Sequence, residues 1–188
     1  MDKFKPIDLI DIIDSERHWS CGRAMAKYKG SYPLGFLERL NKRISLYNKK
    51  VLSLFCGISV FGDTLDIKPE LNPTYIADAR NKFPILDNTY DVIIADPPYD
   101  SQNITYSNKL YNTDLIKPYS FVKESVRILK PGGYLCILHQ LVYLTPKGTF
   151  IYTVIPITSG PNLRIRVLNI FIKNEAENKI NFKNNQNK

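Results

Sequence analysis

The segment 90–99, with the sequence YDVIIADPPY, decides how this chain of 188 residues is expected to fold. Residues 92–95 form a short, unbroken apolar run, which predicts a strand buried on both faces of a sheet. Two prolines follow, and each fixes φ and lacks an amide hydrogen, so the strand must end near Asp96. The segment therefore predicts an acidic side chain held on a rigid turn at the carboxyl end of a buried strand.

Other parts of the chain show similar apolar or β-rich runs, most of them continuous rather than alternating. The expected strands are 51–55, 62–67, 74–77, 90–95, 134–138, 150–157 and 166–172. Helical spacing places Phe36, Leu40 and Ile44 on one face, and a second helix is expected over 118–129, ended by the residues Lys130-Pro131-Gly132-Gly133. Strands buried on both faces predict an α/β fold, a single doubly wound and mostly parallel sheet with helices on both faces.

The connection between the first two of these strands is unusually short. About five residues separate them, whereas a crossover helix normally needs roughly 10–12. We therefore expect the first crossover helix to be short or missing. The remaining organisation is a basic N-terminal extension with a helical segment over 1–50, the sheet domain over 51–173 and a disordered polar tail over 174–188.

Composition and charge exclude several classes of protein. No apolar run reaches the ~20 residues of a membrane helix, and the N-terminus lacks the apolar stretch of a signal peptide. Three scattered cysteines fit a reducing compartment, so a cytoplasmic location is expected. The formal net charge of +8 is segregated: residues 17–50 hold nine basic side chains and one acid, whereas residues 51–100 hold three and eight. This pattern predicts a polyanion-binding surface beside a pocket for an amine.

Four turn or polar positions fall at the carboxyl ends of expected strands. They are Cys56-Gly57, Asp66, Asp78 and Asp96. Ligands of open α/β sheets bind beyond these ends, so the four positions are expected to meet at one site. The carboxylates lie on different strand ends without metal-ligand spacing, and no metal is expected. Asp66 could instead be a strand-end turn residue, and Asp78 could cap the following turn.

The segment Asp96-Pro97-Pro98-Tyr99 has the chemistry of a clamp for an exocyclic amine. The Asp96 carboxylate and the Pro97 carbonyl can accept the two N–H hydrogens, while Tyr99 stacks on the ring that bears the amine. Such a grip directs the nitrogen lone pair toward an electrophile. The alternative is an ordinary loop in which the prolines merely end the strand.

On these residues the sequence resembles the class I amino-methyltransferases that use S-adenosylmethionine to methylate adenine N6 or cytosine N4. Their Asp/Asn/Ser-Pro-Pro-aromatic tetrapeptide is present as residues 96–99. Residues 54–57 are similar to the family's cofactor motif, residues 31–36 to its upstream motif, and the unit around 130–133 to a common element of the class. The resemblance covers roughly residues 30–172 and implies a methyltransferase catalytic domain with a Rossmann-like fold.

The resemblance also implies roles for individual residues. S-adenosylmethionine, with S-adenosylhomocysteine as the product, would be bound by Tyr32, Pro33, Phe55, Cys56, Gly57, Asp66, Asp78 and Ala79. Within that cofactor site, Asp66 would accept hydrogen bonds from the ribose hydroxyls and Asp78 would accept one from the adenine amine. The catalytic segment would be Asp96, Pro97, Pro98 and Tyr99. Two positions depart from the family pattern: Ser53 stands where an acid is usual, and Ser59 replaces a second glycine.

A nucleic-acid substrate also needs a surface that grips phosphates, because a target base must be single-stranded or flipped out of its stack. The candidate residues are Arg17, Arg23, Lys27, Lys29, Arg164 and Arg166. Arg164 and Arg166 could instead face solvent on an edge strand. No segment is long enough for a separate target-recognition region, so recognition is degenerate, or supplied by a partner subunit, or directed at structured RNA.

The sequence thus predicts an S-adenosylmethionine-dependent methyltransferase acting on adenine N6 in DNA first and cytosine N4 second. One alternative is an RNA or protein-glutamine methyltransferase, although the glutamine enzymes typically begin the tetrapeptide with Asn. The other is a catalytically inactive methyltransferase-like subunit that binds nucleic acid.

Overall fold

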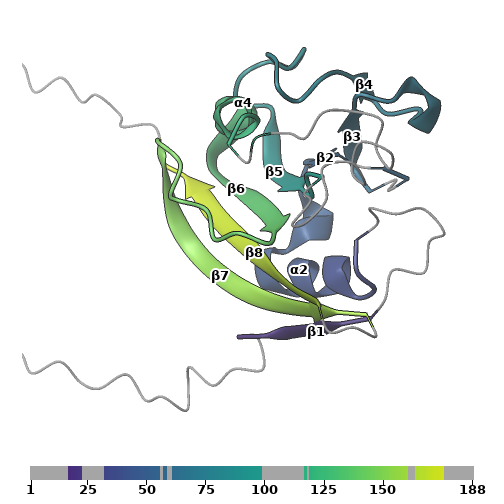
Figure 1. The fold of residues 1–188 in the computed structure, drawn as a ribbon. Helices are drawn as coiled ribbons and strands as arrows, with labels where there is room; N and C mark the ends of the chain where they lie inside the picture. Colours follow the sequence, from purple (N-terminus) through teal and green to yellow (C-terminus); the bar gives the residue numbers. More distant parts are fainter. Residues whose placement is uncertain are drawn as a thin grey trace, which may run out of the picture.

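One sheet organises the part of the chain that the structure describes, and eight strands in the order β1-β7-β8-β6-β5-β2-β3-β4 form it (Figure 1). The computed structural model describes residues 17–22, 32–55, 57–58, 61–98, 117, 119–160 and 164–175. The strands are β1 (Trp19–Cys21), β2 (Val51–Leu54), β3 (Asp63–Asp66), β4 (Tyr75–Ile76), β5 (Tyr90–Ala95), β6 (Leu129–His139), β7 (Thr149–Ser159) and β8 (Arg164–Lys173). The helices are α2 (Phe36–Ile44) and α4 (Val122–Ile128), with the short 3-10 helices η1 (Leu46–Asn48) and η2 (Pro69–Leu71).

Five neighbouring strands, β4, β3, β2, β5 and β6, run parallel to one another. β8 lies antiparallel between β6 and β7, and β1 pairs parallel with the end of β7. The expected α/β class with a mostly parallel sheet is confirmed. Because the five strands share a direction, the segments that follow β2, β3, β4 and β5 all leave the sheet at the same edge.

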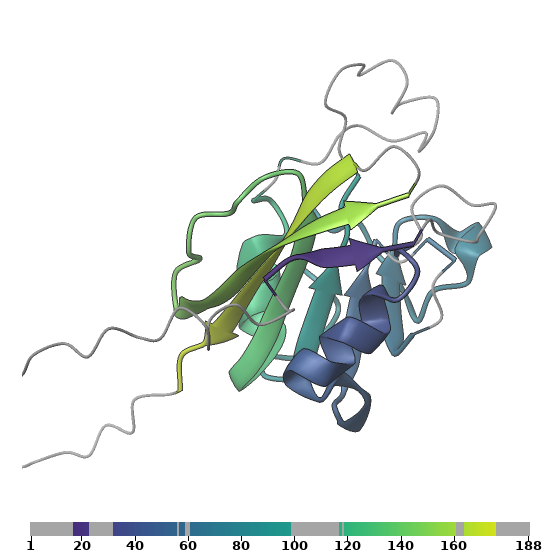
Figure 2. The same ribbon diagram turned by 90° about the horizontal axis from the view of Figure 1, so that it is seen from below.

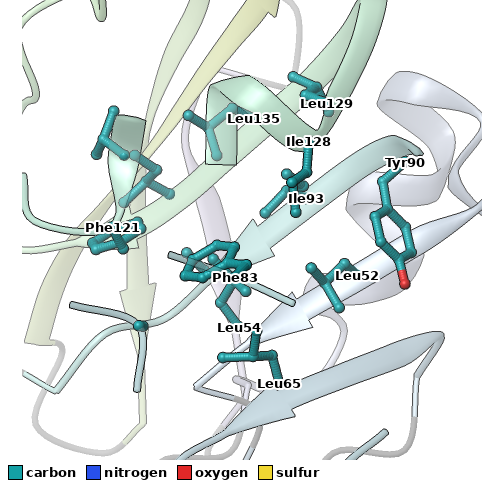
Figure 3. Close-up of a cluster of buried hydrophobic side chains, with 14 of the residues drawn as sticks. Leu52, Leu54, Leu65, Phe83, Tyr90, Ile93, Phe121, Ile128, Leu129 and Leu135 are labelled. Carbon is teal, nitrogen blue, oxygen red and sulfur yellow. The ribbon is translucent and has the colours of Figure 1, made fainter. Parts of the chain in front are cut away.

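Each face of the sheet carries its own hydrophobic core and its own helix (Figures 1 and 2). On the face covered by α2, side chains from the strands and the helix form a cluster that includes Trp19, Phe36, Leu40, Ile94 and Ile170. On the face covered by α4, the cluster shown in Figure 3 is built around Leu52, Leu54, Phe83, Ile93 and Phe121. Coverage on both sides explains why the central strands read as unbroken apolar runs.

Helix α2 forms where the spacing of apolar residues predicted it. Gly35 precedes it with a φ of 82°, a left-handed conformation that glycine adopts without a Cβ clash. Phe36, Leu40 and Ile44 are the buried positions of the helix. The Phe36 ring meets Trp19 edge-on with 6.1 Å between ring centroids, so α2 also fixes β1 against the sheet.

The expected break over residues 130–133 is wrong in one respect. α4 ends at Ile128 and β6 already begins at Leu129, so residues 130–133 lie within the strand, whose pairing with β5 is irregular between Tyr90 and Val92. A Cβ on Gly133 would lie only 2.8 Å from the Asp91 carbonyl oxygen, so glycine allows the two strands to approach there. The helix therefore passes directly into a strand with an irregular start.

The first connection is short, as expected. Residues 57–58 and 61–62, its described part, contain turns and bends but no helix. Gly62 has a φ of 71°, and a Cβ there would lie 2.7 Å from the Val51 carbonyl oxygen. The chain thus returns close to the start of β2 before β3 begins.

The described part of residues 17–50 belongs to the same sheet and core as the rest. Trp19 pairs with Ile157, and Gly22 forms an antiparallel bridge with Leu34. The segment expected to be an extension thus supplies an outer strand and one covering helix. Among the described residues, no helix has both the length and the apolar character needed to cross a membrane.

Candidate functional site

The predicted site residues at the strand ends lie along one edge of the sheet. Gly57 follows β2, Asp66 ends β3, Asp78 follows β4 and Asp96 follows β5. The parallel pairing of these four strands places all of them at the carboxyl edge, where α/β proteins bind ligands. Cys56 and Tyr99 lie outside the described residues.

Gly57 and Asp66 are in direct contact. The Gly57 amide donates to Oδ2 of Asp66 over 3.3 Å, and the Lys68 amide donates to Oδ1 over 3.1 Å. Gly57 is buried and has a φ of 52°, and Phe55 has a φ of 57°, which is a costly conformation for a residue with a side chain. Asp66 thus holds a tight turn, and a carboxylate with about four acceptor positions can still receive hydroxyl donors.

Asp78 is held by the residue two positions along the chain. The Arg80 amide donates to Oδ1 of Asp78 over 2.9 Å, and the Arg80 guanidinium bonds both carboxylate oxygens at 2.7–3.0 Å. These hydrogen bonds lower the pKa of Asp78 below its ordinary value. The alternative interpretation, in which Asp78 caps a turn, therefore describes its contacts, and an adenine amine would share this carboxylate with Arg80.

The apolar candidates of the cofactor group lie in the core or at its margin. Ala79 is buried, and the half-buried ring of Phe55 meets Phe121 edge-on at 5.2 Å between centroids. On the opposite face, Pro33 is buried and the Tyr32 ring stacks on Phe36 at 5.2 Å. Phe55 and Ala79 thus lie on the α4 side of the sheet, while Tyr32 and Pro33 lie on the α2 side.

Ser53 stands where the family's cofactor motif usually has an acid, and its hydroxyl makes a structural contact instead. Its side chain is fully buried, and its hydroxyl donates to the Phe61 carbonyl oxygen over 2.9 Å. The hydroxyl therefore binds the backbone of the following turn. An acid at this position would bring a charge into that buried contact.

The Asp96 carboxylate is bound by an arginine from the other end of the chain. One guanidinium nitrogen of Arg166, on β8, lies 3.0 Å from Oδ2 and 3.3 Å from Oδ1 of Asp96. The side chains are 6% exposed for Asp96 and 13% for Arg166. Burial raises the pKa of Asp96 to about 6, although the charge and hydrogen bond of Arg166 act in the opposite direction. Pro97, the next residue, is buried.

Of the predicted phosphate-binding residues, the structure describes Arg17, Arg164 and Arg166. Arg166 binds Asp96 and is largely buried on β8, a strand inside the sheet, so the alternative in which Arg166 faces solvent on an edge strand is wrong. Arg17 is exposed, and Arg164 begins β8. Arg23, Lys27 and Lys29 lie outside the described residues. Other cations of the basic block cover aromatic rings: Lys49 lies over Tyr134 and Lys50 over Tyr90.

A polar and aromatic group at the end of β6 was not predicted from the sequence. The Leu141 amide donates to Nδ1 of His139 over 3.0 Å, and burial lowers the pKa of His139 to about 4, so the ring is neutral at pH 7. Tyr143 packs on His139, and its amide donates to the buried Asn169 side chain over 2.9 Å. No local pattern links these residues, because β6 and β8 bring them together only in the fold.

The described residues contain no group of three or more His, Cys, Asp or Glu side chains able to hold a metal ion. The three carboxylates of the edge are instead bound by backbone amides or by arginine.

Comparison with known proteins supports the fold. No protein-family model matches the sequence, and no curated protein matches it at a significant level. TrmN from Thermus thermophilus superposes with a TM-score of 0.51 at 17% identity, covering 77% of this chain and 50% of that chain. The N-methyltransferase NodS from Bradyrhizobium japonicum WM9 gives a TM-score of 0.50 at 14% identity, covering 74% of this chain and 96% of that one.

A candidate S-adenosylmethionine-dependent methyltransferase from Listeria monocytogenes also gives a TM-score of 0.50, at 13% identity over 75% of this chain and 99% of that one. At such identities the likeness concerns the fold. The chain therefore has the Rossmann-like fold of S-adenosylmethionine-dependent class I methyltransferases. It covers only half of the TrmN chain.

Proposed function

We propose that this chain is an S-adenosylmethionine-dependent N-methyltransferase of the EC 2.1.1 class that acts on an exocyclic amino group of a nucleic-acid base. The observation that carries the proposal is the buried Asp96 carboxylate, which a proline-proline turn holds at the carboxyl edge of a sheet with the methyltransferase fold. A polar acceptor in this place suits an amine that must be oriented rather than deprotonated in advance.

The residues at the ends of β2 and β3 fit the cofactor. Gly57 presents backbone without a side chain, and Asp66 retains acceptor positions for ribose hydroxyls beyond the two amides that it binds. Phe55 and Ala79 would add apolar contacts from the α4 side. S-adenosylmethionine supplies a methyl group on a sulfonium, and S-adenosylhomocysteine is left as the product.

On the acceptor side, the chain would first orient the amine and then accept a proton from it. The Asp96 carboxylate and the Pro97 carbonyl accept its two N–H hydrogens, so that the lone pair points along the edge of the sheet toward β2. After methyl transfer the nitrogen is cationic and has to lose a proton. A carboxylate with a pKa of about 6 takes this proton more readily than an ordinary aspartate. Tyr99 is proposed to stack on the base.

Adenine N6 in DNA is the first candidate acceptor and cytosine N4 the second, and the Asp that begins the tetrapeptide favours these bases over a glutamine side chain. The exposed Arg17 is a candidate phosphate contact, and the remaining grip would come from the other basic residues of the N-terminal half or from a partner subunit. Such contacts predict binding that weakens steeply with salt.

The test is incubation of the protein with tritiated S-adenosylmethionine and a panel of duplex DNA, single-stranded DNA, ribosomal RNA and protein, followed by nucleoside mass spectrometry. We expect a methylated amino base in one nucleic-acid fraction, and little or no product from Asp96→Ala. Label in the protein fraction alone would contradict the proposed acceptor. Calorimetry with S-adenosylhomocysteine provides the companion measurement, because an inactive methyltransferase-like subunit would not bind it.

A further inference from the structure

We propose that Arg166 is a positioning residue of the amine clamp: it stays bound to Asp96 during turnover, balances the carboxylate charge and makes the clamp select a neutral amino group. The inference rests on the proposed function for the identity of the ligand, but not for the contact itself. It is carried by the geometry of the pair and by its burial.

The pair is built into the fold rather than formed on the surface. Asp96 follows Val92 and Ile94 in the alternation of β5, and Arg166 precedes Leu168 and Ile170 in that of β8; these four apolar residues share the core on the α2 face. β6 lies between β5 and β8 in the sheet. Arg166 therefore reaches past the end of β6 to meet a carboxylate 70 residues earlier in the chain.

The contact leaves acceptor capacity on the carboxylate. One guanidinium nitrogen of Arg166 bonds Asp96, and it lies between the two oxygens at 3.0 and 3.3 Å. A carboxylate offers about four acceptor positions, so a single bridging donor can remain in place while an amine N–H binds another position. Displacement of Arg166 is therefore not required for a substrate to bind.

The charge of the pair decides which amine is bound. A buried carboxylate without a cation would favour an alkylammonium ion, because an uncompensated charge is costly away from water. With Arg166 the charge is already balanced, and a second cation would be repelled by the guanidinium. A neutral N–H donor, such as the amino group of adenine or cytosine, meets no such repulsion.

Other ionisable groups flank the pair without replacing Arg166. On the α2 side, Cys21 of β1 interacts with Arg166 and also with Glu38 and Arg39 of α2. At the end of β6 lies His139, which is neutral at pH 7. Across β2 lies Asp66 of β3. Among the charged groups of the described residues, Arg166 is the one that lowers the pKa of Asp96. Removing Arg166 should therefore raise that pKa further.

The first test follows the titration of Asp96 by NMR of protein labelled with ¹³C at aspartate carboxyl carbons, with Asp96→Asn to assign the resonance. Asp96 is expected to titrate near pH 6 in the wild type and at least one pH unit higher in Arg166→Met. In Arg166→Lys it should titrate between these values, because lysine restores the positive charge. The matched control is Lys130→Met, which removes the 2.8 Å contact to Asp91 at the other end of β5. It should move Asp91 and leave Asp96 unchanged.

The second test uses two probes, adenosine and butylammonium, and observes the Asp96 resonance. At a pH above the Asp96 pKa of each protein, where the carboxylate is ionised, adenosine should shift the Asp96 resonance of the wild type and butylammonium should not, whereas butylammonium should shift the resonance of Arg166→Met. If Arg166→Met does not fold, Arg166→Lys still tests the proposal, since it must retain the preference for adenosine. An unchanged Asp96 titration in both arginine variants, or equal responses of the wild type to the two probes, would overturn the role of Arg166.

Neither measurement needs methyl transfer, so the two proposals can fail separately. A shifted titration in Arg166→Met, together with no methylated base from any substrate, would leave the electrostatic role of Arg166 intact and refute the proposed enzyme. Where transfer is observed, the acid side of its pH profile should move to higher pH in Arg166→Met.

Discussion

The two halves of the carboxyl edge hold their carboxylates in different ways. In the half formed by β2, β3 and β4, Asp66 and Asp78 are bound by groups within nine residues along the chain. In the half formed by β5, β6 and β8, Asp96 is bound by Arg166, 70 residues later. The first half is built from strands of two to four residues, and the second from strands of six to eleven.

This difference shows how the two halves obtain their rigidity. A turn that closes on its own backbone needs little support, which suits the short strands and tight loops of the proposed cofactor site. A buried charge whose partner comes from a distant strand needs a long, well-packed sheet to keep the two groups in register. The amine clamp is therefore the part of the edge most dependent on the whole fold.

The strongest test of the comparison is Asp96→Ala, which we expect to lower the rate of methyl transfer by about 10²–10³-fold, the usual cost of removing one oriented polar group from a reacting centre. Binding of S-adenosylhomocysteine should be nearly unchanged, because the proposed site of that ligand lies in the other half. Rates are measured with tritiated cofactor. Asp87→Ala, which removes an exposed carboxylate bound to Arg127, is the control and should behave as wild type. Turnover retained in Asp96→Ala would refute the assigned role.

The next effect concerns the packing of the long strands. Asn169 is fully buried, accepts a hydrogen bond from the Tyr143 amide at 2.9 Å and donates to the Leu141 carbonyl at 3.0 Å. Asn169→Ala leaves both backbone groups without this partner and should lower the free energy of unfolding by about 2–3 kcal/mol. Urea denaturation measures the change. Asn174→Ala, at an exposed position, should lower the free energy of unfolding by less than about 0.5 kcal/mol. Equal losses in the two variants would argue against a stabilising role of the Asn169 hydrogen bonds.

In the cofactor half, Asp66→Ala should raise the dissociation constant of S-adenosylhomocysteine about tenfold, which corresponds to ~1.4 kcal/mol. The physical reason is the loss of acceptors for the ribose together with the loss of the Gly57 contact. Calorimetry gives the constant, and Glu70→Ala, an exposed acid in η2, is the comparison variant. An unaltered constant would remove Asp66 from the ribose site.

The smallest effect is expected at Asp78. Its carboxylate is partly exposed and already bound to Arg80, so Asp78→Ala should weaken cofactor binding only about threefold, within the range of a single neutral hydrogen bond. Arg80→Met frees the carboxylate and should strengthen binding by about twofold. If Asp78→Ala weakens binding as much as Asp66→Ala, the two carboxylates are equivalent and the ranking within this half is wrong.

Much of the fold was predictable because its determinants are local. The unbroken apolar runs predicted the central strands, and the spacing of Phe36, Leu40 and Ile44 predicted the buried face of α2. The start of β6 was not predictable in detail. Gly132 and Gly133 are typical of a break, yet here they let the strand begin at Leu129 against β5.

The candidate site likewise has a part that could be predicted from the sequence and a part that could not. The positions of Asp66, Asp78 and Asp96 at strand ends follow from the sequence, and the contact between Asp78 and Arg80 lies within a single turn. The group of His139, Tyr143 and Asn169 has no local pattern, since residues from β6, β8 and the loop after β6 meet only when the antiparallel pair forms.

By itself, the sequence determined that a stiff acidic turn ends a doubly covered strand, because proline geometry and burial act over a few residues. The tertiary structure alone decided that a guanidinium from β8 neutralises that acid. Such a pairing depends on how strands from distant parts of the chain are ordered in one sheet, and no short-range preference of the backbone encodes that order.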